Sequence, residues 1–114
     1  MKKQGVLLAL TNAVQGRDEE YNTWYNQRHL VDILKVPGIT AAKRYRLSGA
    51  QPSDGAWKYL AIYEIDTDDL NSVVQEIKRR WGTDVMPLTD ALADKRLGWY
   101  FEKLAISPSE LASS

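Results

Sequence analysis

Hydrophobic residues recur along the chain with two spacings, one typical of strands and one typical of helices. Residues 6–10 are a continuous apolar run, which indicates a strand that is buried on both faces. Residues 43–48 and 96–103 alternate apolar and polar positions, and residues 57–65 are rich in aromatic and β-branched side chains. All three patterns predict strands. The polar, glycine-containing residues 49–55 are few enough to join the second and third strands as an antiparallel pair.

Two other stretches have the spacing of a helix that buries one face. The first begins at acidic residues 18–20, which a helix N-terminus favours, and ends at the Val-Pro-Gly sequence of residues 36–38. Its apolar stripe slips to the opposite side beyond His29, so we predict a kink or break at this point. The second helix spans residues 70–81, and residues 86–93 could add one or two helical turns.

The predicted order of elements is β-α-β-β-α-β. This is the split βαβ order of ferredoxin-like α+β domains, in which a four-stranded antiparallel sheet carries both helices on one face. A chain of 114 residues is long enough for one core but short for two. We therefore predict one domain over residues 1–106, followed by a polar C-terminal tail over residues 107–114.

The third predicted strand is apolar on both sides, which bears on assembly. Leu60 and Ile62 share one face, which we expect to lie under the helices, and Tyr59 and Tyr63 share the other. Two helices can cover only one face of the sheet, so the other would be a larger apolar patch than monomers usually expose. The uncovered face would carry several of the aromatic residues Tyr45, Trp57, Tyr59, Tyr63, Trp99 and Phe101. We predict a homodimer that pairs through this sheet face.

Charge and cysteine content exclude several classes of partner and site. Lys and Arg together number 15, as do Asp and Glu, so no basic excess would draw the chain to nucleic acid or to an anionic membrane. The chain contains no cysteine, which excludes disulfides, thiolate metal sites and a cysteine nucleophile. The apolar run near the N-terminus is too short to span a membrane and lacks a signal-peptide cleavage pattern. We expect a cytoplasmic protein with no nucleic-acid or membrane partner.

His29 is the only histidine, and its unperturbed pKa of about 6.5 makes it the one side chain suited to proton exchange near neutral pH. It follows Trp24 and Tyr25 in a stretch crowded with aromatic and hydrogen-bonding groups. We interpret it as a general acid or base at the mouth of a pocket, assisted by Tyr25. The alternative is a structural histidine at the end of the helix, which caps carbonyl groups or forms a structural hydrogen bond. One histidine with Asp32 nearby supplies too few ligands for a metal site, so we expect no metal and no cofactor.

Five further residues are candidates for substrate binding. Trp24 and Tyr63 belong to an aromatic supply that suits a flat apolar or aromatic ligand, and Asn12 ends a strand, where polar groups often reach such pockets. Glu64 lies on the face of the third strand that we expect under the helices, where a carboxylate must be paired or have a raised pKa. Arg44 and Arg46 on the neighbouring strand are its candidate partners, and a purely structural Glu–Arg pair is the alternative.

The aromatic and histidine positions of the first helix resemble a family signature. Trp24, Tyr25 and His29, followed by the Val-Pro-Gly turn at residues 36–38, resemble the EthD-like branch of the dimeric α+β barrel superfamily. The matching order of elements extends the resemblance over about residues 5–103. Members usually carry a proline or a comparable breaker just after the histidine, where this chain has Leu-Val.

The resemblance implies a homodimer whose two sheets form a barrel with the helices outside. Members of the superfamily include cofactor-free monooxygenases, muconolactone-type isomerases, polyketide cyclases and stress-responsive proteins, so the fold does not settle the reaction. Our leading hypothesis is a cofactor-independent enzyme that uses His29 and Tyr25 for proton transfer on a small aromatic, polyketide-like or lactone-like molecule. Isomerisation, cyclisation, elimination and oxygenation remain open. The alternative is a non-catalytic small-molecule-binding or stress-response dimer.

Overall fold

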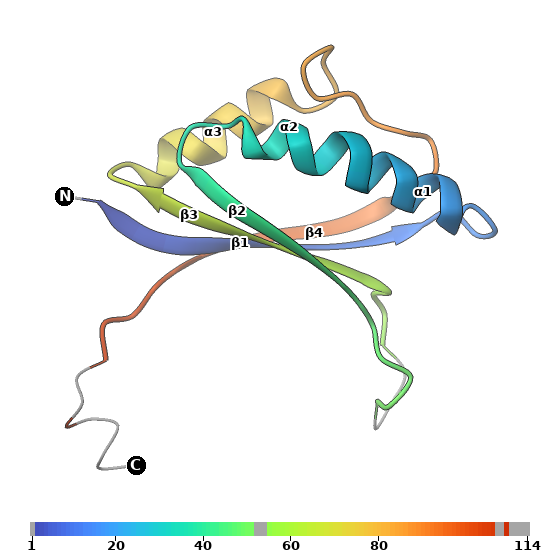
Figure 1. Cartoon of the computed structure of the whole chain (residues 1–114), viewed down its shortest axis with the longest axis horizontal. Coiled ribbons are helices and arrows are strands. Elements are labelled where there is room, and N and C mark those ends of the chain that lie inside the picture. The colour runs from blue at the N-terminus through green and yellow to red at the C-terminus, as the bar shows by residue number, and fades with distance from the viewer. Residues whose placement is uncertain (1, 52–54, 107–108, 110–114) are drawn as a thin grey trace.

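A computed structural model describes residues 2–51, 55–106 and 109 of the chain. One antiparallel sheet carries all the helical segments on the same face (Figure 1). The elements in chain order are β1 (Lys3–Ala13), α1 (Asp18–Trp24), η1 (Tyr25–His29), α2 (Leu30–Leu34), β2 (Ile39–Arg46), β3 (Tyr59–Thr67), α3 (Leu70–Arg80) and β4 (Leu92–Glu102). The sheet order is β2-β3-β1-β4, and every neighbouring pair is antiparallel. The predicted ferredoxin-like fold is confirmed.

The first helix is continuous, and a five-residue π-helical segment, η1, joins its two α-helical parts. A π turn holds more residues than an α turn, so it shifts the positions that follow it around the helix axis. As a result, both Tyr21 of α1 and Ile33 of α2 are buried. The predicted break after His29 is therefore wrong, since helical residues run without interruption from Asp18 to Leu34. The slip in the hydrophobic stripe that suggested it is present in the sequence, but the π turn absorbs it.

The two faces of the sheet are the reverse of the prediction. Tyr59 and Tyr63 of β3 are buried on the face below the helices, whereas Leu60 and Ile62 are half-buried on the helix-free face. Alternation along a strand shows which residues share a face, but not which face meets the helices. The inner face suits a tyrosine because its hydroxyl finds a partner there: the hydroxyl oxygen of Tyr63 lies 3.0 Å from that of Tyr25.

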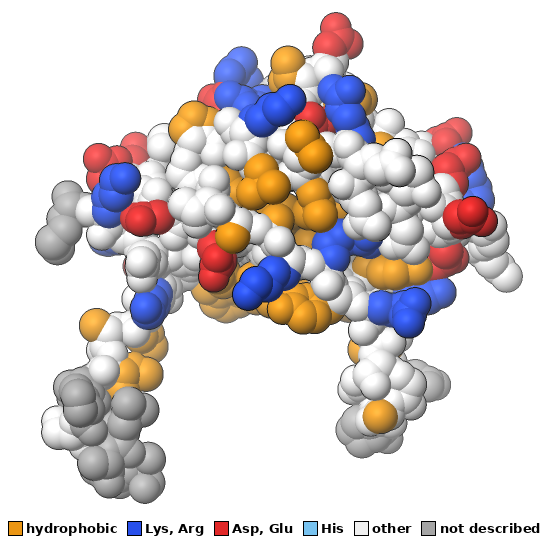
Figure 2. Space-filling model, viewed as in Figure 1, with side chains coloured by type: hydrophobic (Ala, Val, Ile, Leu, Met, Phe, Trp, Pro, Cys, Tyr) orange, Lys and Arg blue, Asp and Glu red, His pale blue; other side chains and the backbone are white. Residues whose placement is uncertain are grey.

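The helix-free face of the sheet is broadly apolar. Strand pairing places Leu8 of β1 between Ile62 of β3 and Trp99 of β4. Large side chains on this side are well exposed, among them Tyr45, Trp99 and Phe101. Figure 2 shows hydrophobic side chains along the lower side of the body, between the two segments that project from it. An uncovered apolar face therefore exists, but its exposed aromatic members come from β2 and β4 rather than from β3.

The turn between α2 and β2 depends on Gly38. Its φ of 98° lies in the left-handed region, which residues with a side chain adopt only at a cost. An added Cβ atom would also lie 2.9 Å from Cγ2 of Val73 in α3. The carbonyl oxygen of Gly38 accepts a 2.8 Å hydrogen bond from the backbone N–H of Asp66. This turn therefore holds the end of the first helix close to β3 and α3.

Replacing Gly38 with alanine is expected to lower the free energy of unfolding by about 1–3 kcal/mol, because strain at a positive φ adds to the contact with Val73. Urea denaturation followed by circular dichroism measures the loss. Gly49→Ala is the matched control, since nothing lies within 4 Å of its added Cβ and its φ is not positive. Its expected change is within about 0.5 kcal/mol. A loss at Gly38 no larger than that at Gly49 would contradict this account of the turn.

Two other predictions concern the C-terminal part of the chain. Residues 86–93 contain no helix, and hydrogen bonds such as that from the N–H of Met86 to the carbonyl of Thr83 close turns instead. The predicted polar tail, residues 107–114, lies outside the described residues except for Ser109. No helix in the described ranges is both long enough and apolar enough to cross a membrane.

Candidate functional site

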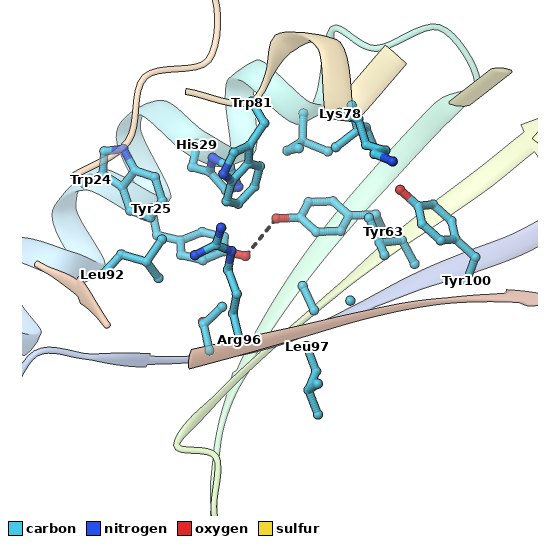
Figure 3. Close-up of a pocket in the computed structure, with 16 residues that line it drawn as sticks. Trp24, Tyr25, His29, Tyr63, Lys78, Trp81, Leu92, Arg96, Leu97 and Tyr100 are labelled. Atoms are coloured by element: carbon cyan, nitrogen blue, oxygen red, sulfur yellow. Dashed lines mark hydrogen bonds between the residues drawn. The ribbon is translucent and has the colours of Figure 1, made fainter. Parts of the chain in front are cut away.

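A cavity of about 470 Å³ lies between the sheet and the helices, within the size range of small-molecule sites. Most of its wall is apolar or aromatic (Figure 3). The sheet contributes Leu7, Ala9, Thr11, Tyr63, Gly98 and Tyr100, and the helical layer contributes Trp24, Tyr25, His29, Ile33, Ile77 and Trp81. Two exposed cations, Lys78 of α3 and Arg96 of β4, also line it. Their exposure places the mouth of the cavity between α3 and β4.

Small residues in the middle of the sheet create the hollow. Ala61 of β3, Ala9 of β1 and Gly98 of β4 are paired directly across three strands. Two residues further along their strands, on the same face, are the large side chains of Tyr63 and Tyr100. A row of small side chains beside a row of large ones leaves a trough on the inner face of the sheet.

The end of η1 places His29 at the helical side of the cavity. Its imidazole stacks on the indole ring of Trp24 at a centroid distance of 4.6 Å and meets the rings of Tyr25 and Trp81 edge-on at 5.0 and 5.2 Å. Only 3 % of the residue is exposed, and its Nδ1 atom has no hydrogen-bond partner among the described residues. Buried polar atoms without a partner are rare, and a catalytic role is one explanation for them. The alternative of a histidine that caps the end of the helix is wrong, since the helix continues past His29 to Leu34.

Burial lowers the pKa of His29 from 6.5 to about 4. Removal of the imidazole from water disfavours its charged form; the carboxylate of Asp32 opposes this effect, and the cation of Arg44 adds to it. The imidazole is therefore neutral at neutral pH. In this state it can accept a proton.

The lowered pKa predicts a pH dependence of stability. The unfolded chain binds a proton at His29 near pH 6.5 and the folded chain only near pH 4, so this contribution is complete above pH 6.5 and is lost as the pH falls towards 4. The full difference corresponds to roughly 3 kcal/mol. Urea denaturation at about pH 7 and about pH 4.5 should show a smaller loss for His29→Gln than for the wild type, because glutamine does not titrate. Carboxylates titrate in both proteins, so equal losses would contradict the burial of the imidazole.

Two tyrosine hydroxyls form a hydrogen-bonded polar pair in the cavity wall. The hydroxyl oxygens of Tyr25 and Tyr63 lie 3.0 Å apart and share a hydrogen bond (Figure 3). Burial raises the pKa of Tyr25 to about 12 and that of Tyr63 well above its ordinary value, so both stay protonated at neutral pH. One hydroxyl donates to the other, which leaves the hydrogen of the accepting hydroxyl for a further partner. The pair can therefore donate a hydrogen bond to an oxygen atom of a ligand.

Arg44 holds Tyr25 in place from outside the cavity. Its guanidinium carbon lies 4.2 Å from the centroid of the Tyr25 ring, and its N–H groups donate to the Oδ1 atoms of Asn22 and Asn26 at 2.8 and 2.7 Å. The cation–π contact and these hydrogen bonds fix the ring and thus the position of its hydroxyl. Arg44 is absent from the cavity wall. The predicted ion pair with Glu64 is wrong, because asparagine side chains bind the guanidinium instead.

Two predicted binding residues lie away from the cavity. Glu64 is exposed on the helix-free face of β3, so the expectation of a carboxylate under the helices is wrong, because the two faces are reversed. Asn12 holds the connection before β3: its amide donates to the carbonyl of Ala56 at 3.0 Å and accepts from the N–H of Lys58 at 2.8 Å. The other predicted site residues do line the cavity together, namely Trp24, Tyr25, His29 and Tyr63.

Several residues of the cavity wall were not predicted as site residues: Lys78, Trp81, Arg96, Gly98 and Tyr100. Three of them occupy alternate positions of one strand, a signal that they share a face. The sequence does not show which strand lies beside them or at what register. In the described part of the chain no three His, Asp or Glu side chains come together as a possible metal site.

The fold is shared with solved structures of bacterial proteins. An EthD (ethyl tert-butyl ether d) family protein from Bacillus halodurans C-125 matches with a TM-score of 0.59 and 19 % identity, over 89 % of this chain and 99 % of that one. This chain has an EthD-like fold. A "putative monooxygenase" from Shewanella loihica PV-4 matches with a TM-score of 0.60 and 11 % identity, over 93 % of this chain and 99 % of the other. No protein-family model and no curated protein matches the chain. The EthD-like resemblance is confirmed for the fold, and such identities carry no statement about activity.

Proposed function

We propose that this EthD-like chain is a cofactor-independent enzyme that transfers a proton on a small aromatic, polyketide-like or lactone-like molecule, with His29 as the base. The observation that carries the proposal is the convergence of three kinds of group on one apolar cavity: a neutral imidazole, a protonated tyrosine pair and two cations at the mouth. Titratable groups with shifted pKa values that share a cavity are typical of active sites. A cleft filled by side chains would instead favour a structural histidine.

The proposed step removes a proton from a carbon atom next to a carbonyl group. The C–H bond breaks, its electron pair forms the C=C bond of an enolate, the carbonyl oxygen takes the negative charge, and the proton binds to the imidazole of His29. The pair of Tyr25 and Tyr63 donates a hydrogen bond to that oxygen, which stabilises the developing charge. Return of the proton to another carbon of the same molecule gives an isomer and restores neutral His29. The step therefore balances without an external reactant.

The low pKa of His29 limits the range of substrates that it could deprotonate. A base with a pKa of about 4 removes a proton slowly from an ordinary ketone, because the pKa of the ketone C–H group is much higher than that of the base. A carbon between two carbonyl groups, or one conjugated with a lactone, is more acidic and reduces this difference. Polyketide-like and lactone-like molecules contain such carbons. Negative charge on a bound substrate would also raise the pKa of the adjacent imidazole and so strengthen the base.

A non-catalytic binding protein is the second candidate. The observation that favours it is the enclosure of His29 by three aromatic rings, an arrangement that could serve only to shape an apolar binding surface. Both candidates predict that the cavity binds a small molecule. Only the enzyme predicts a chemical change in that molecule that depends on His29.

A ligand screen followed by isotope exchange tests the proposal. Aromatic, 1,3-dicarbonyl and lactone compounds that bind the folded chain raise its melting temperature, and each such compound is then incubated with the protein in deuterated water. The expected result is exchange of a C–H hydrogen for deuterium faster than in protein-free solution, or formation of an isomer, detected by mass spectrometry and NMR and reduced to the protein-free rate by His29→Gln. Compounds that bind but stay unchanged throughout would contradict the enzyme and support the binding protein.

We further propose that the chain forms a homodimer through the helix-free face of the sheet. Exposed Tyr45, Trp99 and Phe101 support this proposal, because burial of such side chains between two copies would remove a large apolar surface from water. Leu47 and Leu104, just beyond the ends of β2 and β4, are exposed as well and could extend the contact. A two-fold axis would bring the same patch of both copies together, with the helices outside.

A further inference from the structure

The mouth of the cavity is positively charged in a chain whose charges balance. The cavity wall includes Lys78 and Arg96 but no Asp or Glu, although the sequence has 15 acidic and 15 basic residues. Figure 3 shows Lys78 at the helical side of the cavity and Arg96 rising from the sheet side. Cations that line a cavity without acidic neighbours in the same wall favour a ligand with a negative charge.

Lys78 differs from the basic residues beside it. Arg79 and Arg80 both form ion pairs with Glu76 in the same helix. Lys78 forms no ion pair with any residue that the structure describes. Its ammonium group therefore remains available to a ligand at the mouth of the cavity.

Arg96 is connected to the imidazole through one aromatic ring. Its guanidinium carbon lies 5.0 Å from the centroid of the Trp81 ring, and that ring meets His29 edge-on at 5.2 Å. The one hydrogen bond of its side chain within the described residues is a long contact of 3.4 Å to the carbonyl of Asp94. Arg96 pairs with no carboxylate there. A group bound to this guanidinium would lie one indole ring away from the proposed base.

Gly98 leaves room for a flat group beside Arg96. Arg96, Gly98 and Tyr100 alternate along the inner face of β4, so the position without a side chain lies between a cation and a phenol ring. An added Cβ atom would meet only Cδ1 of Leu7, at 3.8 Å. Glycine inside a strand weakens the strand and often marks the close approach of a ligand. The space above Gly98 is therefore open to part of a bound molecule.

We infer that the cavity takes a small, flat organic acid whose carboxylate binds Arg96, with Lys78 adding positive charge at the same mouth, and whose conjugated body lies over Gly98. The inference rests on the proposed function, since it names the substrate class of the same cavity. A guanidinium binds a carboxylate through two parallel N–H···O hydrogen bonds, and an ammonium adds a point charge. The ring of Trp81 provides a flat wall for the body of the acid. The carboxylate then sets the orientation in which the rest of the molecule reaches His29.

Three probes with one ring system and different charges test the inference: 2-naphthoate, neutral 2-naphthamide and cationic 2-naphthylmethylamine. Isothermal titration calorimetry at low ionic strength is expected to show binding of the acid at least about tenfold tighter than that of the amide, with the amine weakest. Added salt should weaken binding of the acid and leave the amide unchanged, because the charges at the mouth are screened. Equal affinities for acid and amide, or no binding of the acid, would overturn the inference.

Variants of the same protein locate the charge preference. Arg96→Gln and Lys78→Gln are each expected to remove most of the preference for the acid and to leave the affinity for the amide unchanged. Lys95→Gln is the matched control, since it removes the same charge from the same strand at a residue outside the cavity wall. Gly98→Leu is expected to block binding of the acid and the amide, with circular dichroism confirming the fold. The inference would be refuted if the preference for the acid persisted in each of the two glutamine variants, or if it fell as much in Lys95→Gln as in them.

Because these measurements concern binding alone, they separate this inference from the proposed function. Preference for the acid, together with no isotope exchange on any bound compound, would leave the inference standing and contradict the enzyme. Isotope exchange on a neutral compound, with no preference for the acid, would support the enzyme and refute the inference.

Discussion

Replacing His29 with glutamine is expected to lower kcat/KM by about 100-fold to 10,000-fold, the usual contribution of a positioned general base. Glutamine is polar and close in size to histidine, but it does not titrate. The proposed step then lacks its proton acceptor, although the cavity and the hydroxyl pair of Tyr25 and Tyr63 remain. Steady-state kinetics on a compound identified by isotope exchange measure the loss. Calorimetry is expected to show little change in the affinity for the same compound.

Gln27→Ala is the matched control, because Gln27 is exposed on the same π-helical segment. Equal losses in this variant and in His29→Gln would point to the shape of the segment rather than to the imidazole, and would contradict a base at His29. The pH profile gives a second readout. A pKa of about 4 predicts that kcat/KM stays constant from about pH 8 to about pH 5 and falls as the pH drops through 4 and His29 takes up a proton. A fall centred near pH 6.5 would instead indicate a solvated imidazole.

Trp99→Lys is expected to convert the proposed homodimer into a monomer. The side chain is 51 % exposed in the single chain, so the substitution costs the folded monomer little, but the proposed interface would bury it. A lysine there would lose its hydration in both copies, so two-fold symmetry doubles the penalty. A total penalty of about 3 kcal/mol raises the dissociation constant roughly 100-fold. Light scattering or sedimentation at micromolar concentration measures the mass.

Val85→Lys serves as the control for a charge added at an exposed apolar position, since Val85 lies in the connection after α3 and not on the sheet. This variant is expected to keep the mass of the wild type. A wild-type chain that is monomeric at micromolar concentration would contradict the homodimer. A dimer that survives Trp99→Lys would place the interface on another surface.

The shift of the apolar stripe of the first helix beyond His29 shows how far hydrophobic periodicity can predict this fold. The positions of Tyr21 and Ile33 show that one straight α-helix cannot bury both side chains. They do not show whether the backbone bends, breaks or takes up a π turn, because all three restore the register. The answer depends on packing around the imidazole, and one of the packed rings belongs to Trp81, far along the chain. Local pattern predicted the place of the irregularity, and tertiary contacts determine its form.

The errors among the predicted site residues have separate physical causes. Alternation left the inner and outer faces of β3 undecided, and reversal of that one choice moved Glu64 from the interior to the surface. Asn12 does lie near the end of β1, but backbone groups of the connection before β3 use both ends of its amide. Gly98 and Arg96 could not be recognised as cavity residues, because the strand register that places them beside Ala9 and Thr11 of β1 is not stated by the sequence.

β4, which forms one side of the cavity, is an edge strand of the sheet. Residues 96, 98 and 100 border the cavity and solvent, whereas Tyr21 and Ile33 on the helical side belong to the packed core. A change on the edge strand can therefore alter the charge and shape offered to a ligand without repacking the interior. Divergence in ligand preference among chains of this architecture would cost least along β4, while the helix keeps the imidazole in place.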